Sequence, residues 1–166
     1  MIHNLEISPA EPSDAEEIEE IYCSLVGAPG CIWDDQYPTI DHVRHDIENG
    51  AAFKAVIDGR IVGAAYCGDY EEKELLKCFD GAEKLGEFGR VGVRREFHRM
   101  GVAEALLRYL KGNAKERGYD ALSLLVARNN FGAMALYEKL GFKNVGESEL
   151  YDMEWYCYLC KLLEDI

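Results

Sequence analysis

The sequence contains no apolar run that approaches the ~20 residues needed for a membrane-spanning helix. Its opening stretch, MIHNLEISPAEPSDAEEIEE, also lacks a basic segment followed by an apolar run, so no secretory signal is expected. We therefore predict a cytoplasmic protein that has no membrane partner.

Basic residues are scarce, with 18 Lys and Arg against 31 Asp and Glu, for a net charge of −13. A nucleic-acid partner is not expected, because phosphate recognition needs stripes of Lys and Arg. The surplus of carboxylates fits a cationic partner or substrate, and it fits a solvated surface equally well.

The chain also lacks a complete zinc-binding motif. Cys157 and Cys160 have the CxxC spacing, but no second pair completes a site, so no metal is expected. On a strand these two side chains would point to opposite faces. In a reducing compartment we expect the six cysteines to be free thiols that act as small buried hydrophobes.

No internal repeat, low-complexity tract or linker interrupts the 166 residues, which predicts a single domain over 1–166. Strands and helices interleave, and strand pairs occur at both ends, which indicates an α/β (α+β) fold with a mixed sheet. A capping box, Ser13 to Glu16, predicts the first helix, and Thr39 is expected to cap the second. The remaining elements are predicted as strands over 5–8, 53–57, 60–66, 87–93, 121–126, 142–147 and 155–159, and as helices from about 102 and over 130–140. Asp58-Gly59 predicts a hairpin between the second and third of these strands. The last helix has one apolar face, made by Ala133, Leu136, Tyr137 and Leu140.

Positive charge gathers just before one of these helices. Between residues 90 and 99 four arginines oppose the single carboxylate of Glu96, and Gly101 and Ala103 follow at the helix start. Free N–H groups and the helix dipole make such a start a ready anion site, and small residues would let a pyrophosphate approach. A basic helix cap that binds nothing is the alternative. A P-loop is excluded, because GxxxxGK[ST] is absent.

Two motifs together resemble the GNAT superfamily of N-acetyltransferases. Its pyrophosphate motif, R/Q-x-x-G-x-G/A, reads here His98-Arg-Met-Gly101-Val-Ala103. Its second motif, N-x-x-A-x-x-L-Y-E-K-L-G-F, is matched at every fixed position from Asn130 to Phe142. One departure stands out, since His98 replaces the usual Arg or Gln and is followed by Arg99.

The resemblance implies a mixed, mainly antiparallel central sheet flanked by helices, and acetyl-CoA as the acetyl donor. It implies that the strand before the helix holds the pantetheine arm through main-chain groups, with the Val91 N–H near the acetyl carbonyl. The cofactor-binding residues expected from it are Val91, Val93, His98, Arg99, Met100, Gly101, Val102, Ala103 and Asn130.

Two residues are expected to be catalytic on the same resemblance. Glu87 lies where several family members place a general base, although it also fits a surface carboxylate at a strand start. Tyr137 matches the tyrosine that donates to the departing thiolate, although an apolar helix face alone would make it a core residue. No cysteine or serine lies in a nucleophile motif, so direct transfer without an acetyl-enzyme is expected.

In this family the acceptor pocket lies between the N-terminal helices and the closing strands, which implies that a stretch with two aromatics and two carboxylates contacts the acceptor. Such a stretch suits an ammonium group, and the alternative is a loop that is simply solvated. Its residues are Trp33, Asp34, Asp35 and Tyr37. We predict transfer to a small cationic or polyamine-like amine. A protein N-terminal or lysine acetyltransferase and a non-catalytic acyl-CoA-binding module remain alternatives. Aromatic residues near the C-terminus, Trp155, Tyr156 and Tyr158, suit a homodimer interface as well as a core.

Overall fold

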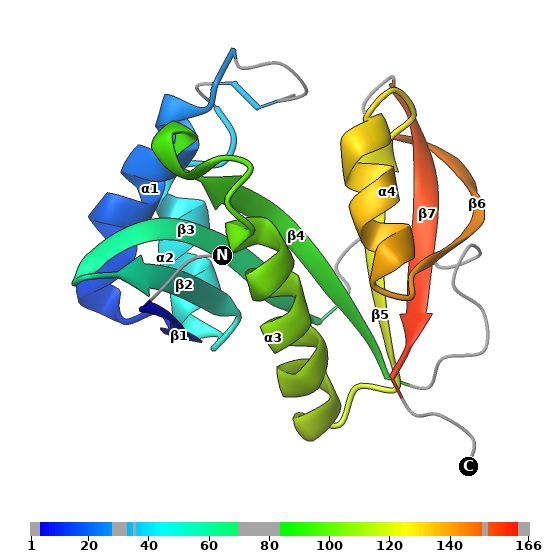
Figure 1. Cartoon of the computed structure of the whole chain (residues 1–166), viewed down its shortest axis with the longest axis horizontal. Helices are drawn as coiled ribbons and strands as arrows, with labels where there is room; N and C mark the ends of the chain where they lie inside the picture. The colour runs from blue at the N-terminus through cyan, green and yellow to red at the C-terminus, as the bar shows by residue number, and fades with distance from the viewer. Residues whose placement is uncertain (1–3, 28–32, 35, 70–83, 151–152, 163–166) are drawn as a thin grey trace. The chain divides into compact units, whose positions relative to one another are not determined.

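The computed structural model describes the chain outside residues 1–3, 28–32, 35, 70–83, 151–152 and 163–166 (Figure 1). The contacts of the chain divide it into two compact units. The first contains residues 1–68 and 90–109, and the second contains residues 69–89 and 110–166. The predicted single domain over 1–166 stays a prediction.

The first unit is built on strands in the order β1-β2-β3-β4, in which the β1–β2 and β2–β3 pairs are antiparallel. These strands are β1 (Leu5–Pro9), β2 (Ala52–Ile57), β3 (Arg60–Asp69) and the second half of β4 (Leu85–Val93). The predicted hairpin between β2 and β3 is confirmed, since Asp58 and Gly59 have φ values of 48° and 80°. Positive φ at both central residues is what a tight two-residue hairpin requires.

Helices α1 (Ala15–Ser24) and α2 (Ile40–Glu48) share one hydrophobic core with strands β2 and β3. Their contributions include Ile18, Ile21, Val43 and Ile47, which lie at the helical spacing of an apolar stripe. On β2, Ala52 joins this core, whereas its neighbour Phe53 contacts Tyr109 of α3 (Val102–Glu116), with ring centroids 6.1 Å apart. Successive residues of a strand point to opposite faces, so α3 covers the other face of these strands.

Two glycines set how closely the helices approach this sheet. A Cβ at Gly92 of β4 would lie 2.8 Å from the ring of Tyr22 in α1, and a Cβ at Gly63 of β3 would lie 3.1 Å from Val102 in α3. Only hydrogen fits at Gly92 without displacing α1. The first turn of α3 is therefore seated directly on the backbone of β3.

The second unit continues from the first half of β4 in the strand order β4-β5-β7-β6. It contains β5 (Ala121–Ala127), α4 (Phe131–Lys139), β6 (Lys143–Leu150) and β7 (Met153–Lys161), together with the end of α3. β5 pairs in parallel with β4 over Leu85–Glu87, whereas the β5–β7 and β6–β7 pairs are antiparallel. The predicted mixed, mainly antiparallel sheet flanked by helices is thus confirmed, with seven strands.

Local details correct three of the predictions. The prediction of a capping box from Ser13 to Glu16 is wrong. The chain instead forms a 3₁₀ turn over Pro12–Asp14, in which the Asp14 carboxylate accepts from the Glu11 N–H at 2.8 Å. On the predicted apolar face of α4, Leu140 is buried, but Ala133, Leu136 and Tyr137 are only half-buried. Met134, which was not placed on that face, is buried as well. Among the described cysteines Cys67, Cys157 and Cys160 are buried free thiols, but Cys23 is exposed; Cys31 and Cys78 lie outside the described residues.

Other predictions of local structure hold. Thr39 precedes α2, where the Nδ1 atom of His42 accepts from the Thr39 N–H at 2.9 Å. Trp155 and Tyr158 are buried within the second unit, whereas Tyr156 is half-buried, so two of these three rings serve the core. In the described part of the chain, no helix has both the length and the apolar character needed to cross a bilayer.

Candidate functional site

The start of α3 presents main-chain N–H groups that the helix itself does not use. The first helical hydrogen bond runs from the Ala105 N–H to the Gly101 carbonyl at 3.0 Å. Among the described residues, the N–H groups of Gly101, Val102 and Ala103 have no hydrogen-bond acceptor. Together with the helix dipole, unused N–H groups of this kind favour an anion, so the binding of a pyrophosphate here stays a prediction.

The side chains of this turn leave the N–H groups accessible. Gly101 has a φ of 89°, and a Cβ built there would meet no atom within 4 Å, so the space beside it is open. Met100 is exposed, whereas Val102 is buried against the backbone of Gly63. Val102 thus anchors the turn on β3, while the space beside Gly101 stays open.

His98 ties the loop before the helix to β4. Its Nε2 atom lies 2.7 Å from the carbonyl oxygen of Val93. A carbonyl can only accept, so Nε2 carries the proton and donates. His98, which replaces the Arg or Gln of the family motif, therefore holds the loop to Val93 of β4. Val93 is one of the two residues whose main chain is expected to hold the pantetheine arm.

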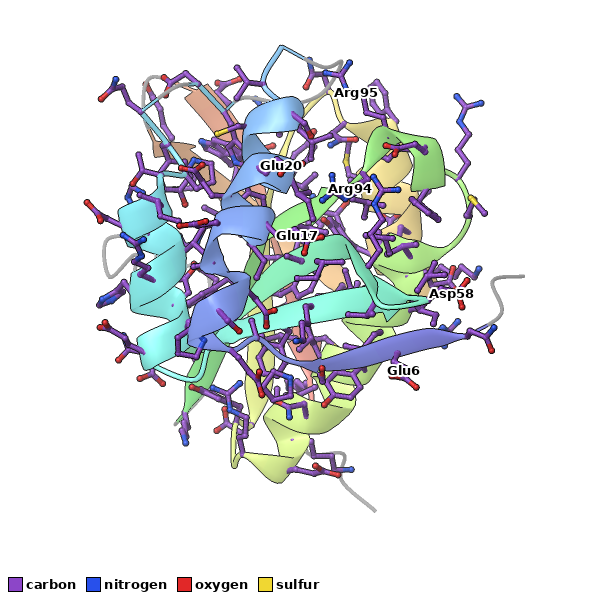
Figure 2. All side chains as sticks on the ribbon, turned by 90° about the vertical axis from the view of Figure 1, so that its left-hand side faces the viewer. Glu6, Glu17, Glu20, Asp58, Arg94 and Arg95 are labelled. Atoms are coloured by element: carbon purple, nitrogen blue, oxygen red, sulfur yellow. The ribbon has the colours of Figure 1, made fainter. Side chains whose placement is uncertain are left out.

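The predicted concentration of positive charge is partly neutralised by residues far away in the sequence. Arg94 is buried between the Glu17 and Glu20 carboxylates of α1, at 3.3 Å from each, and its Nε donates to the Ile61 carbonyl at 2.8 Å. Figure 2 shows Arg94 beside these two glutamates. Counting the four arginines between residues 90 and 99 therefore overstates the positive charge that a ligand can reach. The exposed arginines of this stretch are Arg95 and Arg99.

Arg90 is likewise engaged within the first unit. It forms a two-pronged ion pair with Asp46 of α2 and donates to the Tyr37 hydroxyl at 2.7 Å. Burial lowers the pKa of the Arg90 guanidinium, but hydrogen bonds with Asp46 and Tyr37 outweigh that effect and raise the pKa overall. Arg90 consequently stays charged.

The predicted acceptor segment is held in a short turn. Asp34 and Tyr37 are joined by main-chain hydrogen bonds of 3.2 and 3.4 Å, and the exposed Asp34 carboxylate accepts from the Gln36 N–H at 2.8 Å. Trp33 packs edge-on against Tyr22 of α1, with ring centroids 5.1 Å apart. The structure thus brings Trp33, Asp34 and Tyr37 together, while Asp35 lies outside the described residues.

Glu87 lies in the second unit, on the first half of β4. Its Oε1 atom lies 4.0 Å from where a Cβ of Gly89 would be, so both residues share one face of the strand. The side chain of Glu87 is half-buried. Ser123 of β5 secures this part of the strand by donating to the Gly86 carbonyl at 2.8 Å.

Tyr137 also lies in the second unit, in the middle of α4. Its half-buried ring packs against Phe142 and Tyr158, with centroids 6.1 and 6.3 Å away. Desolvation raises the pKa of Tyr137 to about 12, so the phenol remains protonated at neutral pH. The hydroxyl forms no hydrogen bond with any described residue.

Asn130 acts first as a helix cap, because its side-chain oxygen accepts from the Ala133 N–H at 3.2 Å at the start of α4.

The sequence analysis missed Asp46, because nothing about a carboxylate on an amphipathic helix indicates that it will be buried. Within the described ranges, no cluster of three or more His, Cys, Asp or Glu side chains could hold a metal ion.

A family model described as "Acetyltransferase (GNAT) family" matches residues 16–142. An N-alpha-acetyltransferase of Saccharolobus solfataricus is 31% identical over 113 residues, which are 67% of this chain and 68% of that relative. The N-acetylaspartate synthetase of Homo sapiens is 32% identical over 97 residues, which are 58% of this chain but only 29% of that longer relative.

Solved structures share the fold. A putative acetyltransferase from Salmonella typhimurium, determined with its cofactor acetyl-CoA, superposes with a TM-score of 0.78 at 21% identity. The match covers 98% of this chain and 96% of that one.

The α3 start generates a direct prediction for coenzyme A. Ala103→Glu places a carboxylate beside the free N–H groups, and two like charges ~4 Å apart repel by about 4 kcal/mol near a protein surface. We expect affinity for coenzyme A, measured by calorimetry, to fall by roughly 100-fold or more. An acidic residue is favourable at a helix N-terminus, so the helix itself should remain folded.

Gly112→Glu is the matched control, because it adds the same charge to an exposed position of α3, about 13 Å further along the helix. That variant should bind coenzyme A like the wild type. Unchanged affinity in a folded Ala103→Glu variant would remove the pyrophosphate from this helix start.

Proposed function

Because the chain belongs to the GNAT family of acetyltransferases, which transfer the acetyl group of acetyl-CoA to an amine, we propose that it acetylates a small cationic amine by direct transfer. The observation that carries the donor half of this proposal is the α3 start, with its unused N–H groups and the open space at Gly101. The acceptor half rests on the exposed Asp34 carboxylate, whose main chain pairs with that of Tyr37 and which follows Trp33 in the sequence.

Acetyl-CoA is proposed to bind along β4 and the loop that follows it. The pyrophosphate accepts from the N–H groups of Gly101, Val102 and Ala103, with Met100 lining the turn and the Arg99 side chain adding positive charge. The Val91 and Val93 main chain holds the pantetheine arm, and His98 supports it by fixing the Val93 carbonyl. Asn130 contributes as the cap that orders the start of α4.

The reaction requires a neutral amine, and about one lysine-like amine in 2,500 is neutral at pH 7. In the proposed mechanism, the Glu87 carboxylate takes a proton from the ammonium group, directly or through water. The amine nitrogen then attacks the thioester carbonyl carbon, and the Val91 N–H stabilises the oxygen as it becomes negative. The nitrogen carries a positive charge after the attack and loses a second proton to solvent. When the C–S bond breaks, the coenzyme A thiolate leaves and the neutral amide keeps the acetyl group.

Tyr137 is proposed to donate a hydrogen bond to the departing thiolate. A pKa of about 12 lies well above the value of about 8.5 for a free thiol, so complete proton transfer to the sulfur is unfavourable. The hydroxyl therefore stabilises the leaving group mainly as a hydrogen-bond donor, and the thiolate takes its proton from solvent or remains ionised.

A second candidate acceptor is a protein N-terminal amine, which the match to an archaeal N-alpha-acetyltransferase favours. A panel of polyamines, single amino acids and short peptides, assayed for release of the coenzyme A thiol, separates the two. We expect the highest kcat/KM with a small amine that carries more than one positive charge. A preference for peptides would select the second candidate, and binding of acetyl-CoA without turnover of any amine would leave a non-catalytic module.

Glu87→Gln tests the proposed base. The change keeps the size of the side chain but removes its ability to accept a proton, so kcat should fall by roughly 10²–10⁴ while acetyl-CoA affinity is retained. The acidic limb of the pH–rate profile should change as well. Glu116→Gln, on the exposed end of α3, controls for the lost charge. Wild-type turnover in Glu87→Gln would mean that another group takes the proton.

Tyr137→Phe tests the proposed donor. It removes one oxygen and keeps the ring contacts with Phe142 and Tyr158, so stability should change by about 1 kcal/mol or less. Turnover should fall by roughly tenfold or more. Since the pKa is raised, the wild-type rate should show no alkaline loss from this group below about pH 11. A Tyr137→Phe variant with normal kcat and melting temperature would reduce Tyr137 to a packing residue.

A further inference from the structure

Arg90 is a buried cation whose side chain connects three separate segments of the first unit. Its side chain is 10% exposed, and its Nε and Nη2 atoms contact the two oxygens of Asp46 at 2.9 and 2.7 Å. Its Nη1 atom donates to the Tyr37 hydroxyl at 2.7 Å, and the guanidinium lies 4.5 Å from the ring centre of Tyr66 in β3. All faces of this group are thus used by protein contacts.

The backbone of Arg90 is in an unusual conformation for a strand. Its φ is 44°, in the left-handed region that large side chains rarely adopt. The alternation of buried and half-buried residues along β4 also breaks here, because Gly89, Arg90 and Val91 are all half-buried in succession. Such a backbone conformation persists only when surrounding contacts stabilise it. The hydrogen bonds of the Arg90 guanidinium with Asp46 and Tyr37 supply that stabilisation.

This distortion lies immediately before the proposed oxyanion donor. The torsions of Arg90 set the direction of the peptide group that links it to Val91, and that peptide carries the Val91 N–H. A donor of this kind acts only when it points at the place where negative charge develops. The contacts of the Arg90 side chain consequently fix the aim of a main-chain group one residue away.

The other end of the same network lies in the proposed acceptor segment. Tyr37 is 39% exposed, and its ring packs at 4.8 Å from His42, whose ring also accepts from the Thr39 N–H. Asp46 lies one helical turn further along α2 than His42. Arg90 therefore joins the β4 distortion, Asp46 in the last turn of α2 and the segment around Tyr37 into one hydrogen-bonded group.

We propose that Arg90 is a positioning residue that couples the acceptor segment to the oxyanion donor, so that Tyr37 and the Val91 N–H are oriented together. The inference rests on the proposed function, because it takes Val91 and Tyr37 in the roles assigned to them there. A single ammonium group cannot reproduce the two parallel bonds to Asp46 and the third bond to Tyr37. Lysine at this position should thus keep the charge and lose the geometry.

Steady-state kinetics of Arg90→Lys test this role, with the best acceptor from the amine panel. We expect kcat to fall roughly 10- to 100-fold and the acceptor KM to rise, while acetyl-CoA affinity by calorimetry stays within about twofold. Tyr37→Phe, which removes one exposed hydroxyl and should fold normally, is expected to raise the acceptor KM more than it lowers kcat. In the double variant the two effects on KM should not add, because both act through one contact.

Arg94→Lys is the matched control. Arg94 is equally buried and paired with two carboxylates, but its backbone φ is −54° and it lies outside the proposed network. It should lose stability without a selective loss of kcat. If Arg90→Lys keeps wild-type kcat and KM, or if the Arg90 and Tyr37 effects add, Arg90 is a structural ion pair only. A wild-type protein that acetylates no amine would instead overturn the proposed function, and this inference with it.

Discussion

The close approach of helices to bare backbone is the constraint on which the first unit depends. At Gly92 the ring of Tyr22 occupies the space of a side chain, and at Gly63 the Val102 side chain does the same on the other face. Contacts this short hold α1 and α3 at fixed heights above the strands, since well-packed interiors do not yield easily. The position of the α3 start, and of its free N–H groups, follows from the seat that Gly63 provides for Val102.

Charge is organised at two levels in this acidic chain. Arg90 and Arg94 are buried and compensated by carboxylates of α2 and α1, so they stabilise the arrangement of elements and offer little to a ligand. In the proposed site, the attraction for an anion comes instead from main-chain N–H groups at the helix start and from the exposed Arg99. Main-chain groups do not titrate, so this half of the site should bind its ligand over a wide pH range.

The proposed chemistry uses groups whose environments differ in kind. Tyr137 lies among aromatic rings, where desolvation keeps its proton in place, and that suits a donor. Glu87 is half-buried on a strand beside a glycine, and a carboxylate there suits the proposed proton acceptor. The acceptor segment is different again, because its turn is closed by local main-chain bonds and its Tyr37 is held from outside by Arg90.

Much of the fold and of the donor half of the site could be read from the sequence, because these features are local. Hydrophobic periodicity gave the strands and helices, Asp58-Gly59 gave the hairpin, and Gly101 with Ala103 gave the helix start. Local patterns failed where neighbouring residues offered competing partners. The first capping contact, for example, formed within the 3₁₀ turn at Asp14 instead of at Ser13.

What only the tertiary structure decided was the pairing of charges. Arg90 meets a carboxylate 44 residues away, and Arg94 meets two that lie 74 and 77 residues away. A count of charges along the sequence treats these arginines as able to bind a ligand. The sequence does not show which carboxylates the folded sheet and helices will place beside them. The same holds for the left-handed backbone at Arg90, which exists because Asp46, Tyr37 and Tyr66 converge on one guanidinium. Local sequence determines which groups can bind or react, and long-range packing determines which of them remain free to do so.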